Sequence, residues 1–262
     1  MTSSPRTPGV KNRQRADLLV VERGLADSRA RAQRLILAGQ VWSGERRVEK
    51  SGELVRSDAP LEVRAGERFV SRGGDKLDGA LTSLDVDVRG ACCADIGAST
   101  GGFTDCLLQR GARRVFAIDV GHGQLADKLR NDPRVVVFER TNARYLEEKT
   151  LGEAVDVVVV DASFIGIEKL LPGIVRVLRH GGTLVALVKP QFEAGRAEAA
   201  RGRGVIRDDS VRDKAIGRAR DAIARAGFRV VAEVDSALKG PKGNRERFVL
   251  ATLDQKTSTH TS

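Results

Sequence analysis

Cysteine and histidine are scarce in this chain of 262 residues, which contains 3 of each. Cys92 and Cys93 are adjacent, so in a strand their side chains would point to opposite faces. Their spacing from Cys106 suits neither a disulfide framework nor a zinc site, and the scattered histidines offer no ligand cluster. We therefore expect reduced, buried cysteines and no bound metal.

Long apolar runs are also missing. No uninterrupted apolar stretch approaches the ~20 residues that a membrane-spanning helix needs. The N-terminal stretch MTSSPRTPGVKNRQR lacks the apolar core of a signal peptide, so nothing in it directs export. The sequence therefore predicts a cytoplasmic protein with no membrane-bound segment.

Positive charge is what the chain has in excess. Its 45 lysines and arginines outnumber 35 acidic residues, which gives a formal net charge of +10 and a pI near 10.0. A surplus of this size attracts polyanions, and nucleic acid is the commonest polyanion inside a cell. A general basic bias of the host's proteins is the alternative. The hydrophobic content of 41% is enough for one substantial core and a small second domain.

The N-terminal quarter divides into an arm and a small domain. Residues 1–15 are polar and basic, and we predict a disordered arm there. From Ala16 onward apolar residues recur at helical spacing, with Ser28 as a helix N-cap and Gly39 as a helix stop before a strand. Residues 16–67 are therefore predicted to form a compact α+β domain. Its candidate RNA-phosphate ligands are arginines in or near one helix and the hairpin after it: Arg15, Arg29, Arg31, Arg34, Arg46 and Arg47.

An ordinary solvated helix face is the alternative for such a charge run. The stretch ADLLVVERGLADSRARAQRLILAGQVWSG, however, resembles the alpha-L RNA-binding motif, a small module of a ribosomal small-subunit protein and of pseudouridine synthases. The resemblance covers residues 16–64 and implies that these arginines face RNA.

The rest of the chain reads as one larger α/β domain. Residues 68–74 (RFVSRGG) are predicted to be a flexible linker, with Arg72 as a further RNA contact, and a helix is expected over residues 75–84. Strand-like and helix-like segments then alternate, which predicts a doubly wound, seven-stranded, mostly parallel sheet over residues 75–254 with ligands at the carboxyl ends of the strands. The last two strands are expected to close the sheet as an antiparallel pair. Residues 255–262 are predicted to be a disordered tail.

A glycine-rich loop, DIGASTGGFTD, follows the first strand of this domain. Small residues let the backbone approach a ligand, and the helix after the loop offers N–H groups. The spacing differs from the G-x-G-x-x-G of dinucleotide-binding folds and resembles the S-adenosylmethionine loop of class I (Rossmann-like) methyltransferases. An acid ending the second strand can accept hydrogen bonds from both ribose hydroxyls, and an asparagine after the third is placed to meet adenine. The predicted S-adenosylmethionine contacts are Asp95, Gly97, Ala98, Ser99, Gly101, Gly102, Phe103, Thr104, Asp119, Val120, Asn142 and Asp161.

The fourth and fifth strands end in VVVVDASF and LVALVKPQFE, which places Asp161 and Lys189 at the same edge of the sheet. DASF is not the proline-rich aromatic turn expected of an adenine- or guanine-amine methyltransferase. The cysteines lie far from this edge, which disfavours a pyrimidine carbon-5 methyltransferase with a cysteine nucleophile. A lysine tuned by burial and a neighbouring acid can remove the proton of a ribose 2′-hydroxyl. Taken alone, Lys189 could equally be a surface lysine that reaches back to solvent.

Four charged residues resemble the Lys-Asp-Lys-Glu tetrad of FtsJ-like ribose 2′-O-methyltransferases: Lys76 in SRGGDKL, Asp161 in VDASF, Lys189 in VKPQFE and Glu246 in KGNRERF. With the N-terminal module, residues 16–254 resemble the TlyA family, whose members are often labelled hemolysin. The resemblance implies 2′-O-methylation of cytidine in ribosomal RNA, with S-adenosylmethionine as cofactor and ribosomal subunits as partners. It also implies that Lys189 abstracts the proton, that Asp161 orients it, and that Lys76 and Glu246 complete the charge network.

Two other classes of function stay open at the level of sequence. A membrane-active cytolysin would need an amphipathic or spanning segment, and the best amphipathic helix, residues 209–226, has little bulky apolar content. A ribosome-assembly factor with an inactive methyltransferase fold would need neither the tetrad nor the loop. Phe69 stands where some relatives carry a tryptophan-containing linker, so the choice between ribosomal subunits is open, as is the oligomeric state.

Overall fold

The computed structural model of the chain defines residues 13–64, 66, 68–194, 204–240 and 242–254. It divides into two compact units, Met1–Arg68 and Phe69–Ser262. Most of the predicted arm, residues 1–12, and all of the predicted tail, residues 255–262, lie outside the described residues.

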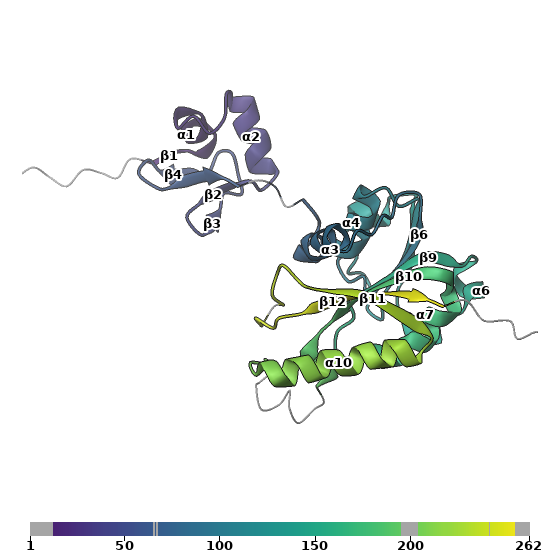
Figure 1. The fold of residues 1–262 in the computed structure, drawn as a ribbon. Coiled ribbons are helices and arrows are strands. Elements are labelled where there is room, and N and C mark those ends of the chain that lie inside the picture. Colours follow the sequence, from purple (N-terminus) through teal and green to yellow (C-terminus); the bar gives the residue numbers. More distant parts are fainter. Residues whose placement is uncertain (1–12, 65, 67, 195–203, 241, 255–262) are drawn as a thin grey trace, which may run out of the picture. The chain divides into compact units, whose positions relative to one another are not determined.

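Unit 1 combines two short helices with two small antiparallel sheets (Figure 1). Ser28 caps α2 as predicted, because its Oγ accepts a hydrogen bond from the backbone N–H of Arg31 at 3.2 Å. Gly39 ends the same helix with φ +70°, a conformation that glycine adopts without strain. The elements are α1 (Ala16–Glu22) and α2 (Arg29–Leu37), the pair β1 (Arg13–Arg15) and β4 (Leu54–Arg56), and the sheet β3 (Arg46–Arg47), β2 (Val41–Ser43) and β5 (Leu61–Val63).

The structure corrects the end of the predicted disordered arm. Arg13–Arg15 form β1, whose residues pair antiparallel with Leu54–Arg56. Their polar side chains concealed this strand, since its pairing depends on backbone hydrogen bonds. The helices and strands of unit 1 enclose a small core that includes Leu19, Ile36 and Val55.

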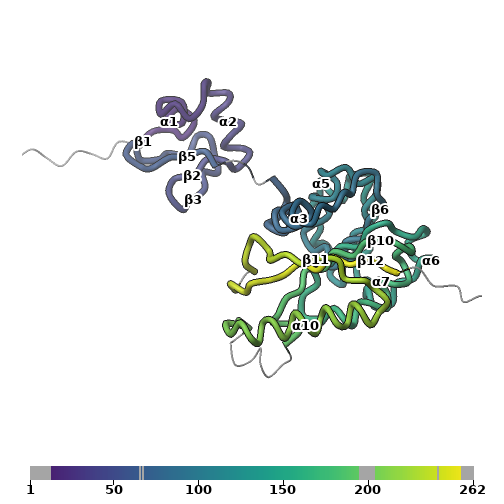
Figure 2. The backbone as a smooth tube through the Cα atoms, viewed as in Figure 1, coloured from purple at the N-terminus to yellow at the C-terminus, as the bar shows by residue number. Residues whose placement is uncertain are grey.

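A seven-stranded sheet forms the centre of unit 2 (Figure 2). The strand order is β11-β12-β10-β9-β6-β7-β8; β12 runs antiparallel to both of its neighbours, and the other neighbouring strands are parallel. The predicted seven-stranded, mostly parallel sheet and its antiparallel closing pair are confirmed. The strands are β6 (Cys92–Ile96), β7 (Arg114–Ile118), β8 (Val135–Phe138), β9 (Val155–Val160), β10 (Leu178–Val188), β11 (Phe228–Asp235) and β12 (Arg247–Leu253).

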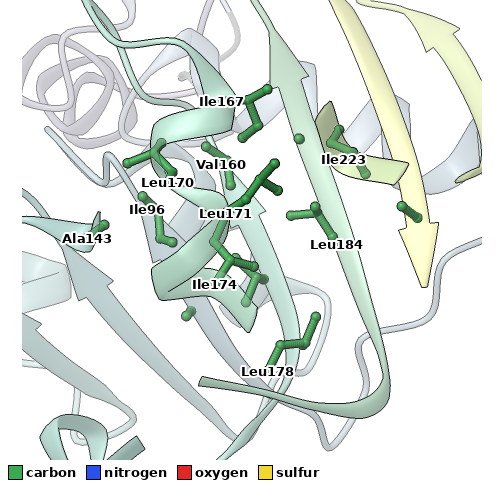
Figure 3. Close-up of a cluster of buried hydrophobic side chains, with 14 of the residues drawn as sticks. Ile96, Ala143, Val160, Ile167, Leu170, Leu171, Ile174, Leu178, Leu184 and Ile223 are labelled. Atoms are coloured by element: carbon green, nitrogen blue, oxygen red, sulfur yellow. The ribbon is translucent and has the colours of Figure 1, made fainter. Parts of the chain in front are cut away.

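Helices cover both faces of this sheet (Figure 1). On one face, α7 (Leu171–Val177) and α10 (Asp209–Arg225) bury apolar side chains against the strands, and Figure 3 shows Ile174 and Ile223 in this cluster with Val160 and Leu184. On the other face, α3 (Arg72–Ser83) and α4 (Gly102–Gln109) do the same. Burial on both faces explains why the central strands read as continuous apolar runs. The shorter elements are α5 (Asp127–Arg130), η1 (Ala143–Tyr145), α6 (Glu148–Leu151), η2 (Ile167–Lys169) and α8 (Pro190–Glu193).

The structure also corrects the predicted linker. Arg72, Gly73 and Gly74 form the first turn of α3 and are not a flexible hinge. A Cβ at Gly74 would lie 2.2 Å from the ring of Phe69, and one at Gly102 would lie 2.9 Å from the backbone nitrogen of Gly74. These glycines therefore serve close packing between α3, α4 and the segment before them.

Candidate active site

A cavity of about 740 Å³ opens at the carboxyl edge of the sheet in unit 2. Ligand pockets in proteins commonly measure about 300–1,000 Å³. The loops after β6, β9 and β10 line it together with the start of α3 and the segment before β12. These elements bring all four residues of the predicted tetrad into one cavity: Lys76, Asp161, Lys189 and Glu246.

Lys189 and Asp161 form one ion pair of this cavity. β9 and β10 are parallel neighbours, with Val160 opposite Ala186, so the residues after both strands emerge side by side. Lys189 Nζ lies 2.8 Å from Asp161 Oδ1. The angles at Oδ1 do not fit a hydrogen bond, so the contact is mainly an ion pair; Nζ also donates to Ser163 Oγ at 2.8 Å and to the Asp161 carbonyl at 3.2 Å. The Lys189 side chain is only 11% exposed, far less than a lysine that reaches back to solvent.

Lys76 and Glu246 form a second, deeper ion pair. Lys76 Nζ lies 2.6 Å from Glu246 Oε2, and the two side chains are 9% and 0% exposed. Glu246 Oε1 is buried without a hydrogen-bond partner among the described residues. A Cβ at Gly240 would lie 2.4 Å from this oxygen, so the glycine makes room for it. The cavity therefore contains two lysine–carboxylate pairs, one from the strand ends and one from α3 and the start of β12.

The glycine-rich loop lies against the first of these pairs. Gly97 has φ +85°, and a Cβ there would lie 3.0 Å from the backbone of Asp161 and Ala162. Only a glycine allows the loop after β6 and the loop after β9 to approach this closely. Of the predicted cofactor contacts in the loop, five line the cavity: Gly97, Ala98, Ser99, Gly102 and Phe103. Gly101 does not; it has φ +97° and lies against Leu125 and Leu129.

Asp95 and Thr104 lie beneath the loop and are not among the residues that line the cavity. Both are 0% exposed, and Thr104 Oγ1 donates a hydrogen bond to Asp95 Oδ2 at 2.7 Å. Burial raises the pKa of Asp95 to about 7, although the hydrogen bond from Thr104 acts in the opposite direction. The two residues brace the loop, and their direct contact with the cofactor stays a prediction.

Asp119, Val120 and Asn142 lie outside the main cavity. Asp119 lines a small adjoining hollow that shares Ala98 and Ser99 with it. The Asp119 carboxylate accepts the backbone N–H groups of Ser99 at 2.8 Å and Gly121 at 2.7 Å, which joins the loops after β6 and β7. A carboxylate has about four acceptor positions, so capacity for ribose hydroxyls remains. Val120 is 71% exposed beside it, and Asn142 is exposed and accepts a hydrogen bond from the backbone N–H of Arg144.

Two aromatic side chains that were not predicted from sequence form one wall of the cavity. Phe164 and Phe192 both line it, with ring centroids 5.2 Å apart. Phe164 is 91% exposed and has φ +65°, which is unusual for a bulky residue. A signal was available, because each phenylalanine follows its tetrad residue, Asp161 or Lys189, by three positions in DASF and KPQF.

Unit 1 holds a separate charge cluster around Asp17. Its side chain is 0% exposed and accepts hydrogen bonds from Arg15 at 3.0 Å, Arg29 at 2.9 Å and Gln33 at 3.0 Å. The Arg15 guanidinium, more than any other neighbour, holds the pKa of Asp17 well below its ordinary value. Two of the predicted RNA ligands are therefore partly engaged inside the unit.

The other predicted RNA ligands of unit 1 differ in their surroundings. Arg46 pairs with Glu53 at 2.5 Å, and Arg47 is exposed beside Gly39. Arg31 and Arg34 are exposed on α2 and have no ion pair within the described part of the chain. Within that same part, no helix is long and apolar enough to cross a membrane, and no group of three or more potential ligand residues could hold a metal ion.

Comparison with known proteins assigns the chain to a family. Residues 69–253 match the FtsJ-like methyltransferase family, and residues 14–60 match the S4 domain. A Mycobacterium tuberculosis protein named 16S/23S rRNA (cytidine-2′-O)-methyltransferase TlyA is 46% identical over 239 residues, which are 90% of this chain and 89% of that protein. The chain belongs to the TlyA family of FtsJ-like methyltransferases.

Other TlyA-like proteins carry a different label. Hemolysin A of Brachyspira hyodysenteriae is 43% identical over 233 residues, which are 88% of this chain and 97% of that protein. A solved structure from Streptococcus thermophilus, described as a candidate hemolysin, is 38% identical with a TM-score of 0.72 over 94% of this chain and 90% of that one. Membership of the TlyA family confirms the predictions of a class I methyltransferase domain and of S-adenosylmethionine as its cofactor.

Proposed function

We propose that this protein transfers a methyl group from S-adenosylmethionine to the ribose 2′-hydroxyl of cytidine in ribosomal RNA, with Lys189 as the base. The observation that carries the proposal is the Lys189–Asp161 ion pair of 2.8 Å, which lies in one cavity with the Lys76–Glu246 pair and the glycine-rich loop. The relative from M. tuberculosis is named for this reaction on 16S and 23S rRNA.

The residues of the cavity fit S-adenosylmethionine. Six residues of the loop line the cavity: Gly97, Ala98, Ser99, Thr100, Gly102 and Phe103. Asp161 supplies a carboxylate whose buried Oδ1 has no hydrogen bond of good geometry among the described residues. Asp119 lines the small hollow that adjoins the cavity at Ser99. Its carboxylate keeps acceptor capacity for ribose hydroxyls. When bound, the cofactor supplies an electrophilic methyl group on a sulfonium sulfur.

Lys189 is placed to accept the proton of the 2′-hydroxyl. In its neutral form Nζ has a lone pair for that proton, and Asp161 then holds the resulting ammonium ion at 2.8 Å. Ser163 Oγ and the Asp161 carbonyl fix the direction of Nζ further. Glu246, held by Lys76, has a free carboxylate oxygen that can accept a hydrogen bond from the ribose. The exposed ring of Phe164 is suited to stacking on a base.

Unit 1 is proposed to bind the ribosomal RNA. Its match to the S4 domain supports this role, as do Arg31 and Arg34, which are exposed and have no ion pair among the described residues. Arginines without an internal carboxylate are free to pair with phosphate oxygens. The partners are then ribosomal subunits, and the activity takes place in the cytoplasm.

The test is a methyl-transfer assay with labelled S-adenosylmethionine and ribosomal subunits from cells that lack this protein. Lys189→Ala should reduce transfer at least about 100-fold, since general base catalysis contributes about 10²–10⁴-fold. Its cofactor affinity should stay within about twofold of the wild type. Lys169→Ala is the matched control, because Lys169 is exposed on η2. Mass spectrometry of the product must find the methyl group on ribose; a methyl group on a base would overturn the proposal.

The two rival functions give different results in the same experiments. Lysis of red cells by Lys189→Ala as strong as by the wild type would support a cytolysin. Normal ribosome binding by wild-type protein that transfers no methyl group would support an assembly factor.

A further inference from the structure

Three cationic side chains border the mouth of the active-site cavity. Arg72 is the first residue of α3, and Lys239 and Lys242 lie in the loop between β11 and β12; all three line the cavity and are exposed. None has an ion pair with another described residue, and Arg72 donates only a long hydrogen bond of 3.5 Å to the Lys239 carbonyl. Deeper in the cavity, by contrast, Lys76 and Lys189 each face a carboxylate. Among the described residues, the two inner lysines are therefore neutralised by carboxylates, and the three rim cations are not.

Exposed cations elsewhere in unit 2 are commonly neutralised by a neighbour. Arg89 pairs with Asp87 at 2.7 Å, and Lys128 pairs with Asp105 at 2.8 Å. These three cations repel one another and have no carboxylate partner among the described residues, so within that part of the chain the rim lacks the compensation found at these sites. An anion from outside the chain would remove that repulsion.

Described residues on either side of the two lysines are held by hydrogen bonds. Asn244, which is 2% exposed, donates Nδ2 to the Gly204 carbonyl and accepts the backbone N–H of Ile206, both at 2.8 Å. The backbone N–H of Gly243 bonds to the Gly240 carbonyl at 2.8 Å, and Gly243 has φ +88°. Figure 2 shows this loop extending from the sheet toward the start of α3. Lys239 and Lys242 therefore lie next to a hydrogen-bonded turn, which also positions Glu246.

We propose that Arg72, Lys239 and Lys242 bind the phosphate groups that flank the target ribose. The inference rests on the proposed function. A 2′-hydroxyl placed at Lys189 has its own 3′-phosphate on the adjacent carbon, so the flanking phosphates must lie at the mouth of the cavity, beside the rim. Arginine can bind a phosphate through two N–H groups, and each lysine acts as a point charge. The substrate is accordingly a polynucleotide, and free cytidine lacks the groups that the rim binds.

The test compares three double variants of the full-length protein. Lys239→Gln with Lys242→Gln removes two rim charges, and Lys239→Arg with Lys242→Arg keeps them. Lys149→Gln with Lys214→Gln is the matched control, since both of these lysines are exposed and lie outside the cavity lining. On ribosomal subunits, the rim glutamine pair should lower kcat/KM at least tenfold with cofactor affinity unchanged. The arginine pair and the control should stay within about threefold of the wild type.

A binding measurement separates failure of this inference from failure of the proposed function. Each lost contact to single-stranded RNA reduces the slope of log affinity against log salt by about 0.7, so the rim glutamine pair should reduce it by about 1.4. A fluorescent single-stranded RNA 12-mer of mixed sequence is the probe. Because RNA binding is measured without methyl transfer, this experiment tests the phosphate role even if the wild type transfers no methyl group. An unchanged slope, unchanged kcat/KM, or failure of the arginine pair to restore activity would each overturn the phosphate role.

Discussion

Gly97→Ala tests the contact that joins the cofactor loop to the tetrad. An alanine at φ +85° costs about 1–2 kcal/mol in backbone strain. Its Cβ would lie 3.0 Å from backbone atoms of Asp161 and Ala162, which cannot rotate away as a side chain could, and overpacking of this kind costs about 1–3 kcal/mol. The lower entropy of the unfolded alanine chain offsets about 0.4–1 kcal/mol. The net expectation is a loss of about 2–3 kcal/mol, or about 5–10 °C in the melting temperature of a unit of this size.

Activity should fall further than stability alone predicts. The clash displaces the backbone of Asp161, and with it the partner of Lys189, and a misplacement of about 1 Å can cost about 10²-fold in rate. The measurements are thermal unfolding and the rate of methyl transfer well below the transition. Gly217→Ala is the control, since Gly217 lies within α10 with nothing within 4 Å of an added Cβ, and it should be stabilising by about 0.5–1 kcal/mol. A Gly97→Ala protein as stable and as active as the wild type would refute the reasoning.

Three further predictions concern charge and capping. Glu246→Gln leaves Lys76 buried without its carboxylate and should cost about 3–5 kcal/mol in urea unfolding; a loss below about 1 kcal/mol would mean that the pair is hydrated. Because the folded-state pKa of Asp17 lies below its ordinary 3.8, its ion pairs stabilise unit 1 above about pH 4, and this stability is lost as the pH falls. Melting temperatures of wild type and Asp17→Asn should therefore converge in acid, and a constant difference would contradict the linkage. Ser28→Ala should cost unit 1 about 1 kcal/mol, whereas Ser28→Asp should keep the cap, as hydrogen exchange in α2 can report.

The meeting of Asp161 and Lys189 could be predicted from sequence for a physical reason. β9 and β10 end in apolar runs because both faces of the sheet are covered there, and each run stops at a charged residue, Asp161 or Lys189. Parallel neighbours end at the same edge, so the order of the strands was enough to bring the two side chains together.

Other features depended on contacts that no local pattern reveals. Gly73 and Gly74 were expected to be a hinge, because paired glycines are common in flexible segments. Their helical conformation follows from packing against Phe69 and Gly102. Phe69 lies just before α3, and Gly102 lies in α4. Asp95 was expected to contact the cofactor, since an acid preceding a glycine-rich loop is typical of such sites, but its burial beside Thr104 depends on how α4 packs over β6.

Each acidic residue of the tetrad has a glycine close beside it. Gly97 admits the backbone of Asp161, and Gly240 admits the Oε1 atom of Glu246; an added Cβ would lie 3.0 Å and 2.4 Å from them. The two glycines are in separate loops, one after β6 and one before β12. A close approach to a glycine therefore occurs twice around one cavity. From sequence, Gly97 is a candidate cofactor contact only, and Gly240 has no assigned role. In the fold, the missing side chain of Gly97 leaves room for the backbone of Asp161, and that of Gly240 leaves room for the Glu246 carboxylate, so both acids lie where Lys189 and Lys76 pair with them.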